Sequence, residues 1–385
     1  MKVAGFFAGI GGLEAGLDDA GHRTVFLCEI DDAAREVLKV RFPDVPTIAK
    51  DIRDIKKLPA GVDLVAAGFP CQDISQAGMT LGMNGTQSVL VNQVFRLLKK
   101  DIPHVLLENV SFMLHLHKGQ VIRHIVGELE RLGFSWAYRV IDTRSFGLPQ
   151  RRQRVFILAS RKFDPWRKLF SQDCPKEEDR EFRGKACGFY WTEGLRGLGW
   201  AVDSIPTLKG GSTVGIPSSP AIWMPDGNIV TPEIRDAERL QGFEADWTKP
   251  AEKVKRPSYR WKLLGNAVGV PVSKWLGKML EARSEWDPPK DSQRFEDEGP
   301  CPSAAFGSRH TGRFRADVSA FPVRYTRVPL SEFLRYEPKP LSAKATEGFI
   351  NRLVRGTLRY PEEFKRALND HLLRQGGLVS EPLVQ

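Results

Sequence analysis

The chain has 385 residues, which exceeds one average domain of ~150 residues, so we expect two or three domains. It carries 57 Lys and Arg against 47 Asp and Glu, and 41% of its residues are hydrophobic. This mixture excludes a disordered or fibrous chain, and the net charge of +10 permits a polyanionic partner. The apolar runs are shorter than the ~20 residues of a membrane span. Five cysteines without C-x-x-C spacing indicate neither a zinc site nor disulfides, so we expect a cytoplasmic protein without a metal site. From the short apolar runs we expect no signal peptide and no membrane contact.

Up to residue 160, short apolar runs alternate with stretches of helical periodicity. The predicted strands are residues 3–7, 24–28, 62–67, 105–107, 136–141 and 155–159. The predicted helices are residues 13–20, 33–42, 90–99 and 121–132. This order predicts a doubly wound α/β domain with parallel strands and right-handed crossovers. Such sheets bind ligands at the carboxyl ends of their strands, which is where we expect the functional site.

Beyond residue 160 the periodicity is lost. Residues 161–230 are rich in Gly, Pro and Trp, which predicts a small domain of loops or short strands. Helical patterns return over 231–242, with Thr231 and Pro232 at the helix start, and over 271–283. The polar stretch 285–318 predicts a linker, and residues from 319 onwards are again helical in pattern.

Three glycines, Gly9, Gly11 and Gly12, follow the first strand in the sequence FFAGIGGLEAGL. Glycine lets the backbone approach a ligand closely, and the start of the next helix presents free N–H groups. A tight turn without a ligand is the simpler interpretation of such a cluster. A dinucleotide fingerprint would have glycine where this chain has Glu14.

Two acidic residues follow at the ends of the next two segments. Glu29 lies about 20 residues after the glycines, where a carboxylate can bind ribose hydroxyls. Asp51 could accept a hydrogen bond from an adenine amino group. Together with the Gly-rich turn, these positions favour a cofactor that contains adenosine, with S-adenosylmethionine as the leading candidate.

Three further clusters point to the same edge of the predicted sheet. Cys71 follows the third predicted strand in GFPCQDIS; most cysteines are simply buried, but this one follows a proline in a polar segment. Glu108 and Asn109 end the next strand. The basic sequence QRRQR, which includes Arg152 and Arg154, runs directly into the last strand, so we expect some of its side chains to point into the site.

Six motifs occur in the order that DNA cytosine C5-methyltransferases carry them: FAGIGG, GFPCQ, ENV, QRRQR, RLQGF and GNAV. The chain therefore resembles that family over residues 1–280. The resemblance implies a doubly wound, mostly parallel, Rossmann-like methyltransferase sheet with a small target-recognition domain and a C-terminal helical extension. The implied domains are a cofactor-binding catalytic domain at 1–160, a target-recognition domain at 161–234, a return to the catalytic domain at 235–284, a linker at 285–318 and a basic helical extension at 319–385.

The resemblance also implies S-adenosylmethionine as the cofactor. Phe7 would stack on the adenine, Glu29 would hold the ribose, and Asp51 would bind the adenine amino group. The methionine end would lie on the Gly-rich turn, and Asn266 would close the pocket. The residues that the resemblance assigns to the cofactor are Phe7, Gly9, Gly11, Gly12, Leu13, Glu29, Ile30, Asp51, Ile52, Pro70, Leu90, Asn266 and Val268.

Carbon 5 of cytosine is a poor nucleophile, so the ring must first be activated by addition at carbon 6. A Cys71 thiolate would make this addition, and Glu108 would share a proton with ring nitrogen N3. Arg152 would hold the cytosine carbonyl oxygen with Arg154 in support. Because a stacked base cannot reach a cysteine at a sheet edge, the cytosine must be flipped out. The residues assigned to substrate binding are Gln72, Ser75, Asn109, Gln150 and Arg239; for Arg239 a role in ordering the recognition domain is preferred.

The leading hypothesis is a monomeric enzyme of the bacterial cytosol or nucleoid that methylates cytosine at a short specific site in double-stranded DNA. A structured RNA substrate and a catalytically silent DNA-binding paralogue are the alternatives; the presence of Cys71, Glu108 and Arg152 argues against the second. Whether a cognate restriction endonuclease acts on the same site is left open. Residues 301–385 carry 14 Lys and Arg against 8 Asp and Glu, which suits either a DNA- or partner-binding extension or a solvated pair of basic helices.

Overall fold

The computed structural model describes residues 1–46, 48–70, 90–175, 181–195, 197–211, 219–284, 286–296 and 298–378. The chain divides into two compact units, each assembled from three separate stretches. The first unit comprises Met1–Phe146, Gln153–Lys176 and Ala267–Tyr325. The second unit comprises Gly147–Arg152, Glu177–Asn266 and Thr326–Gln385.

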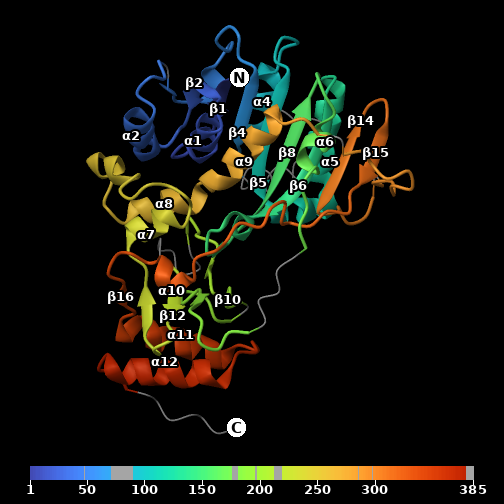
Figure 1. The fold of residues 1–385 in the computed structure, drawn as a ribbon. Coiled ribbons are helices and arrows are strands. Elements are labelled where there is room, and N and C mark those ends of the chain that lie inside the picture. The colour runs from blue at the N-terminus through green and yellow to red at the C-terminus, as the bar shows by residue number, and fades with distance from the viewer. Residues whose placement is uncertain are drawn as a thin grey trace. The chain divides into compact units, whose positions relative to one another are not determined.

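A nine-stranded sheet in the order β15-β14-β6-β8-β5-β4-β1-β2-β3 forms the centre of the first unit (Figure 1). Its strands are β1 (Lys2–Phe6), β2 (Arg23–Cys28), β3 (Ile48–Ala49), β4 (Leu64–Gly68), β5 (His104–Val110), β6 (Ser135–Asp142), β8 (Gln153–Ser160), β14 (Ala304–Ser308) and β15 (Gly312–Arg315). The pairings from β3 to β5 are parallel, whereas β8 is antiparallel to both β5 and β6. The predicted doubly wound α/β domain is confirmed, with an antiparallel strand that the sequence pattern did not distinguish.

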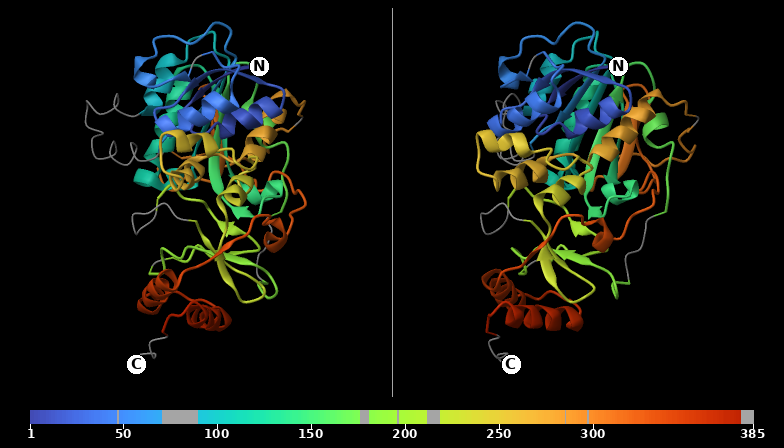
Figure 2. Two further views of the ribbon diagram at one scale, coloured as in Figure 1. Left: turned by 90° about the vertical axis from the view of Figure 1, so that its left-hand side faces the viewer. Right: turned by 60° about the vertical axis from the view of Figure 1, so that its left-hand side comes forward.

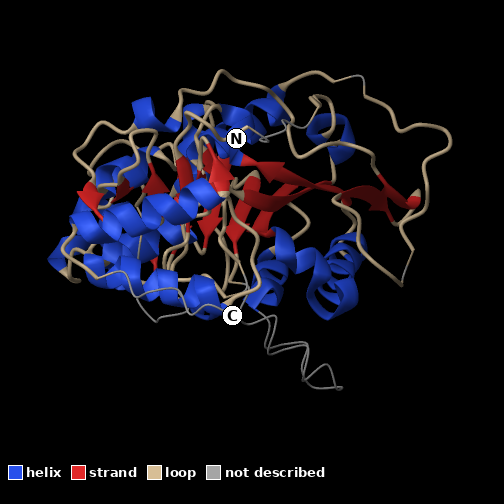
Figure 3. Cartoon of the chain, turned by 90° about the horizontal axis from the view of Figure 1, so that it is seen from below, coloured by secondary structure: helices blue, strands red, loops and turns tan. Residues whose placement is uncertain are grey.

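Helices cover both faces of this sheet, because alternate residues of the buried strands are apolar on both sides. Strand β1 shows the alternation: Ala4 and Phe6 join one hydrophobic cluster and Val3 the other. Helices α4 (Leu90–Leu97) and α5 (Gln120–Arg131) pack into the first cluster, and α1 (Gly12–Asp19), α6 (Pro165–Leu169) and α9 (Val270–Glu281) into the second. Among the described residues of this unit the remaining elements are α2 (Asp32–Arg41), η1 (Ile52–Asp54), η2 (Ser111–Gly119) and η3 (Thr143–Phe146). Figure 3 distinguishes helices from strands by colour.

Helix α9 lies directly against α1, although some 250 residues separate them in the sequence. Gly16 makes this approach possible, because a Cβ there would overlap the Ser273 hydroxyl and the backbone of α9. The Ser273 hydroxyl in turn donates a hydrogen bond of 2.8 Å to the carbonyl oxygen of Gly12. The segment that follows the GNAV motif is therefore anchored to the helix that follows the Gly-rich turn.

The linker predicted over 285–318 is wrong, since this stretch contributes two strands to the central sheet. Strand β14 pairs antiparallel with β6, and β15 pairs with β14. All five residues of β14 are buried, and Phe295 and Cys301 join the hydrophobic core. The sequence pattern did not indicate these strands, because the surrounding stretch is polar and β14, with the sequence AAFGS, is short and made largely of small residues.

The second unit contains an antiparallel sheet in the order β10-β9-β12-β13-β16. Its strands are β9 (Cys187–Phe189), β10 (Ala201–Val202), β12 (Ala221–Trp223), β13 (Ile229–Thr231) and β16 (Lys339–Pro340), and β7 (Gln150–Arg151) pairs separately with β11 (Ile205–Pro206). Its helices are α7 (Ile234–Arg239), η4 (Lys249–Lys253), α8 (Tyr259–Asn266), α10 (Leu330–Phe333), α11 (Ala343–Arg355) and α12 (Glu362–Arg374). Helix α7 begins later than predicted: Glu233 caps it, and Thr231 belongs to β13.

The C-terminal residues supply part of the core of this second unit. The ring of Phe189 on β9 lies 5.1 Å from that of Phe349 on α11 and 4.9 Å from that of Phe364 on α12. Trp200 packs against Phe364 as well. Figure 2 shows α11 and α12, in red, beside the strands of the same unit. The tail is thus an integral part of the domain that holds most of the predicted recognition segment, and the partly buried Trp200 packs against its core.

Replacing Phe306 by Ala tests whether β14 belongs to the core of the first unit. Phe306 is 3% exposed and its ring lies 5.2 Å from that of Trp166 and 5.6 Å from that of Phe314. We expect Phe306→Ala to lower the free energy of unfolding by about 3–5 kcal/mol in urea denaturation, because it leaves a cavity. The matched control is Phe112→Ala in the same unit; Phe112 is 62% exposed, so we expect a change within about 0.5 kcal/mol. Equal effects of the two substitutions would contradict the placement of β14.

Candidate active site

The Gly-rich turn joins β1 to α1 through three residues with positive φ: Phe7 at 52°, Gly9 at 56° and Gly11 at 84°. Gly11 is the N-cap of α1 and no side chain caps the helix there. A Cβ at Gly11 would overlap the Phe42 ring, so glycine is required for packing as well as for conformation. The N–H groups in the first turn of α1, which include those of Gly12 and Leu13, are therefore not satisfied by a cap and could face an anionic group.

Glu29 follows β2 and binds the Gly-rich turn directly. Its Oε2 accepts a hydrogen bond of 2.7 Å from the Gly9 N–H, and its Oε1 accepts one of 2.8 Å from the Asp31 N–H. Burial raises the pKa of Glu29, and these two N–H donors oppose the shift. Glu29 thus already holds the turn in place, while its oxygens keep lone pairs that two ribose hydroxyls could use.

Ile30 and Asp51 lie near the same end of the sheet. Ile30 is 59% exposed, so it offers an accessible apolar surface that an aromatic ring could cover. Asp51 caps η1 and forms an ion pair with Arg53, which holds the pKa of Asp51 below its usual value. Ile52 is buried in the core, so Ile30 is the more accessible of the two predicted adenine contacts.

Glu14, on the first turn of α1, is buried beside this turn. It is 0% exposed, and neither carboxylate oxygen has a hydrogen-bond partner on another described residue. Burial raises its pKa to about 8; the charges of Asp18 and Glu29 add to the shift, and its own backbone N–H opposes it. The sequence placed Glu14 only as the residue that breaks a dinucleotide fingerprint. The signal that could have found its burial is Gly5, a glycine inside a strand, which leaves room for the carboxyl.

The carboxyl end of β5 brings Glu108 and Asn109 to the site. Arg154 on β8 forms an ion pair with Glu108, with 3.2 Å between Arg154 Nε and Glu108 Oε1, and both side chains are largely buried. The buried amide of Asn109 donates a hydrogen bond of 2.9 Å to the carbonyl oxygen of Phe69. This bond ties the end of β5 to the residues that follow β4. The structure thus brings the carboxyl end of β5 together with Arg154 of β8 and with Phe69, which follows β4.

Cys71, Gln72 and Ser75 lie outside the described residues, so their roles stay predictions. The chain is described up to Pro70, which is exposed, and again from Leu90. Leu90 is the first residue of α4 and packs against the hydrophobic core.

Two residues of the QRRQR motif are engaged within the second unit. The buried Arg152 donates hydrogen bonds of 3.0 Å to the carbonyl oxygens of Leu208 and Gly265. The amide of Gln150 bonds to Leu240 and Leu208 backbone groups. Both side chains therefore connect separate backbone segments of that unit, which differs from the substrate contacts that we predicted for them.

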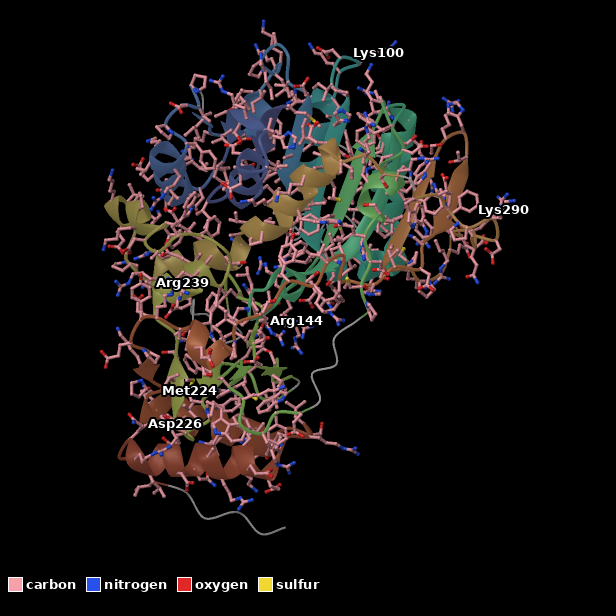
Figure 4. All side chains as sticks on the ribbon, in the orientation of Figure 1. Lys100, Arg144, Met224, Asp226, Arg239 and Lys290 are labelled. Carbon is pink, nitrogen blue, oxygen red and sulfur yellow. The ribbon has the colours of Figure 1, made fainter. Side chains whose placement is uncertain are left out.

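Arg239, labelled in Figure 4, connects α7 to the C-terminal segment. It bonds to Asp236 and, at 2.7 Å, to the carbonyl oxygen of Phe333, whose ring lies under its guanidinium group. Asp236 also accepts hydrogen bonds from the N–H groups of Arg335 and Tyr336. The preferred ordering role of Arg239 is supported by these contacts, which lie within the second unit.

The GNAV motif spans the boundary between the units. Asn266 ends α8 and is exposed; its side chain lies so close to Gly210 that a Cβ there would overlap it. Val268 is buried in the first unit, in the cluster that contains α1 and α9. Within the described stretches, no cluster of three or more His, Cys, Asp or Glu side chains could hold a metal ion, and no helix is long and apolar enough to span a membrane.

The profile of the C-5 cytosine-specific DNA methylase family matches residues 1–198. The chain is 46% identical to the Type II methyltransferase M2.BsuMI of Bacillus subtilis (strain 168), an alignment that covers 96% of this chain and 97% of that relative. It is 30% identical to the Type II methyltransferase M.NgoBI of Neisseria gonorrhoeae, over 70% of this chain and 90% of that relative. The chain therefore belongs to the C-5 cytosine-specific DNA methylase family, as its six motifs indicated. It is a DNA (cytosine-5-)-methyltransferase.

Two solved structures share the fold. The Dnmt2 methyltransferase of S. pombe superimposes with a TM-score of 0.53 at 18% identity. The superposition covers 73% of this chain and 98% of the S. pombe chain. The Entamoeba histolytica methyltransferase EhMeth superimposes with a TM-score of 0.51 at 14% identity, over 73% of this chain and 97% of its own. At these identities the comparison concerns the fold alone, and it confirms the predicted Rossmann-like methyltransferase architecture.

The buried carboxyl of Glu14 predicts a pH dependence of stability. Its folded-state pKa of about 8 lies above the ordinary value of 4.5, so the folded chain binds more protons than the unfolded chain between these values. Stability from this group is therefore greatest below the lower pKa and is lost as the pH rises towards the upper one. We expect the wild type to lose stability relative to Glu14→Gln with a slope approaching about 1.4 kcal/mol per pH unit. Urea denaturation of the cofactor-free proteins from pH 5 to 8 measures this, and parallel curves would contradict the burial of Glu14.

Proposed function

We propose that this enzyme transfers the methyl group of S-adenosylmethionine to carbon 5 of a cytosine that is flipped out of a specific double-stranded DNA site, through a covalent bond between Cys71 and carbon 6 of the ring. The observation that carries the proposal is the Glu108–Arg154 ion pair at the carboxyl end of β5. It lies on the same strand as Asn109, which bonds to Phe69 two residues before Cys71. The acid, the fixed guanidinium group and the residue two positions before the candidate nucleophile thus lie at adjoining strand ends.

Each of these groups has a task in the addition. The Cys71 thiolate attacks carbon 6, and the electron density that this displaces into the ring must be stabilised at N3 and at the carbonyl oxygen. Glu108, when protonated, donates a hydrogen bond to N3. A guanidinium group beside it can hold the carbonyl oxygen, where fixed donors are worth several kcal/mol in the transition state.

We assign the carbonyl contact to Arg154 and not to Arg152, which the motif alone had favoured. Arg154 forms an ion pair with Glu108. Glu108 is expected to bind N3, the ring atom next to the carbonyl group that the guanidinium would hold. Arg152 donates to two backbone carbonyl groups of the second unit and would have to break those bonds to bind cytosine. Its role is then to order the segments around Leu208 and Gly265.

The residues around the Gly-rich turn fit S-adenosylmethionine. Glu29 offers carboxylate oxygens for the ribose, Ile30 offers an exposed apolar surface for the adenine, and the turn leaves N–H groups of α1 without a side-chain cap. When bound, the cofactor supplies an electrophilic methyl group. Phe7, Leu13 and Asp51 would help to orient the cofactor. The second unit, with its antiparallel sheet, would recognise the DNA sequence.

We further propose that the enzyme acts as a monomer in the bacterial cytosol and belongs to a restriction-modification system, so that its methylation protects DNA against an endonuclease with the same site. Support comes from the names of the relatives, which are Type II methyltransferases. The net charge of +10 suits a DNA partner, because phosphate contacts by Lys and Arg supply much of the affinity.

The covalent step can be tested with duplex DNA that carries 5-fluorocytosine, in which the fluorine blocks the final proton removal and traps the adduct. We expect wild type with S-adenosylmethionine to form an adduct that survives denaturing electrophoresis, and Cys71→Ser to form none and to lose methylation. The matched control is Cys174→Ser, since Cys174 is a free, partly exposed thiol in the described part of the chain. A Cys71→Ser enzyme with near-normal turnover would refute the assignment. An RNA duplex of the same sequence tests the alternative substrate, and an adduct on RNA alone would overturn the DNA proposal.

Arg152 and Arg154 can be separated by a matched pair of substitutions. We expect Arg154→Met to lower kcat by about 10²–10³-fold, because the transition state loses a fixed donor. Arg152→Met leaves two buried carbonyl groups without their donor, so we expect it to destabilise the second unit by about 1–3 kcal/mol. Single-turnover kinetics and urea denaturation of both variants measure the two effects. If Arg152→Met instead lowered kcat by about 10²–10³-fold and left the free energy of unfolding unchanged, the carbonyl contact would belong to Arg152.

A further inference from the structure

The 3₁₀-helix η2, which directly follows β5, exposes two aromatic rings on one face. Phe112 is 62% exposed, and its ring lies 6.3 Å from that of His115, which is exposed as well. Because a 3₁₀-helix has three residues per turn, residues three apart lie on the same face. The intervening Met113 and Leu114 are buried in the hydrophobic core. The core thus anchors a pair of adjacent rings that face solvent, a surface that the proposed mechanism does not use.

This pair of rings follows the strand end that carries the candidate active site. Phe112 comes four residues after Glu108, so their Cα atoms are no more than about 14 Å apart. Asn109, between them, bonds to the carbonyl oxygen of Phe69. Successive base pairs in DNA lie about 3.4 Å apart along the helix axis, so 14 Å corresponds to about four base pairs. A DNA strand whose cytosine is bound by Glu108 therefore reaches η2 within a few nucleotides.

The charge of the segment around η2 suits a negatively charged partner. From Asn109 to Gly127 the sequence has no Asp or Glu, but it carries Lys118, Arg123 and three histidines. The guanidinium group of Arg123 is bound to backbone carbonyl oxygens of the stretch before β14. Lys118 is exposed and forms no ion pair with any residue in the described ranges. Lys118 is therefore the cation of this segment that can meet an anion from solution.

A strained turn fixes the position of Lys118. His117, Lys118 and Gly119 have φ angles of 48°, 56° and 82°, and this left-handed conformation is costly for residues other than glycine. Arg123 donates a hydrogen bond of 2.8 Å to the carbonyl oxygen of Lys118, and a Cβ at Gly119 would overlap the Cys301 sulfur. Backbone strain of this kind persists only where surrounding contacts hold it, and it is concentrated at functional sites.

We propose that Phe112 and His115 form an aromatic platform that binds the target DNA strand beside the flipped cytosine, with Lys118 on a neighbouring phosphate. The inference rests on the proposed function, which requires the cytosine to leave the base stack. A flipped nucleotide uncovers the faces of its neighbours, and an aromatic side chain can stack on such a face whatever the base is. Phe112 and Lys118 are thus positioning residues that act on the DNA strand and not on the reacting atoms.

Steady-state methylation of plasmid DNA, with KM for DNA and kcat measured separately, tests the platform. We expect Phe112→Ala to raise KM by about 10- to 100-fold, as for the loss of one stacked base, and to change kcat by less than about 3-fold. Phe112→Tyr keeps the ring and should keep the KM of the wild type. The matched control is Tyr325→Ala, which removes another aromatic ring of the same unit; Tyr325 is 51% exposed, and its loss should leave KM unchanged.

The phosphate contact is tested by the salt dependence of binding to a fluorescein-labelled DNA duplex. Each phosphate contact contributes about 0.9 to the slope of log Kd against the logarithm of the salt concentration, so Lys118→Gln should lower that slope by about 1. The matched control is Lys100→Gln, which makes the same change in charge. Lys100, labelled in Figure 4, is exposed but precedes β5, so it lies near the amino end of that strand. Its replacement should leave the slope unchanged.

The inference fails if Phe112→Ala methylates DNA with the KM of the wild type, or if Lys118→Gln and Lys100→Gln have equal effects on the slope. The proposed function would stand after either result, because the groups that act on the cytosine are not altered. If the wild type itself methylates no DNA, the proposed function fails and this inference fails with it. Urea denaturation of each variant separates a weaker contact with DNA from a loss of folding.

Discussion

The antiparallel pairing of β8 with β5 is the constraint on which the candidate site depends. Because β8 is antiparallel to β5, its first residues lie at the carboxyl end of β5. In a parallel strand they would lie at the amino end of β5. The register places Arg154 opposite Val110 and Phe156 opposite Glu108, so that Arg154 and Glu108 are diagonal neighbours on one face of the sheet. The acid and the guanidinium group therefore meet through backbone geometry, and Asn109 on the same strand ties this edge to the residues before Cys71.

The Gly-rich turn shows a second use of close backbone packing. Gly11 admits the Phe42 ring, Gly16 admits α9, and Gly5 admits the Glu14 carboxyl, so each of these glycines accommodates a specific neighbour. As a result α1 is held on two sides, and its first turn is presented in a fixed orientation. Burial then tunes the acids around it: it raises the pKa of Glu14 and of Glu29, while Arg53 lowers that of Asp51.

The two units interleave in sequence, and this explains which predictions failed. The alternating strands and helices of the first 160 residues were predicted from local periodicity and are present. The strands β14 and β15 were not, because a five-residue strand of small residues has no periodicity to detect. Likewise the tail was predicted as a separate extension, but Phe349 and Phe364 form the core of the second unit with Phe189, a contact between segments more than 150 residues apart.

The sequence by itself determined the family, the doubly wound sheet and the strand ends at which chemistry is expected, because six ordered motifs and local apolar periodicity are both readable along the chain. The tertiary structure alone decided which arginine of QRRQR adjoins Glu108, since that depends on the register between two strands. It also decided that Arg152 and Gln150 bind backbone of the second unit and that Glu14 is buried beside the turn. These are pairings between distant segments, and no local pattern of residues encodes which side chains will be brought together.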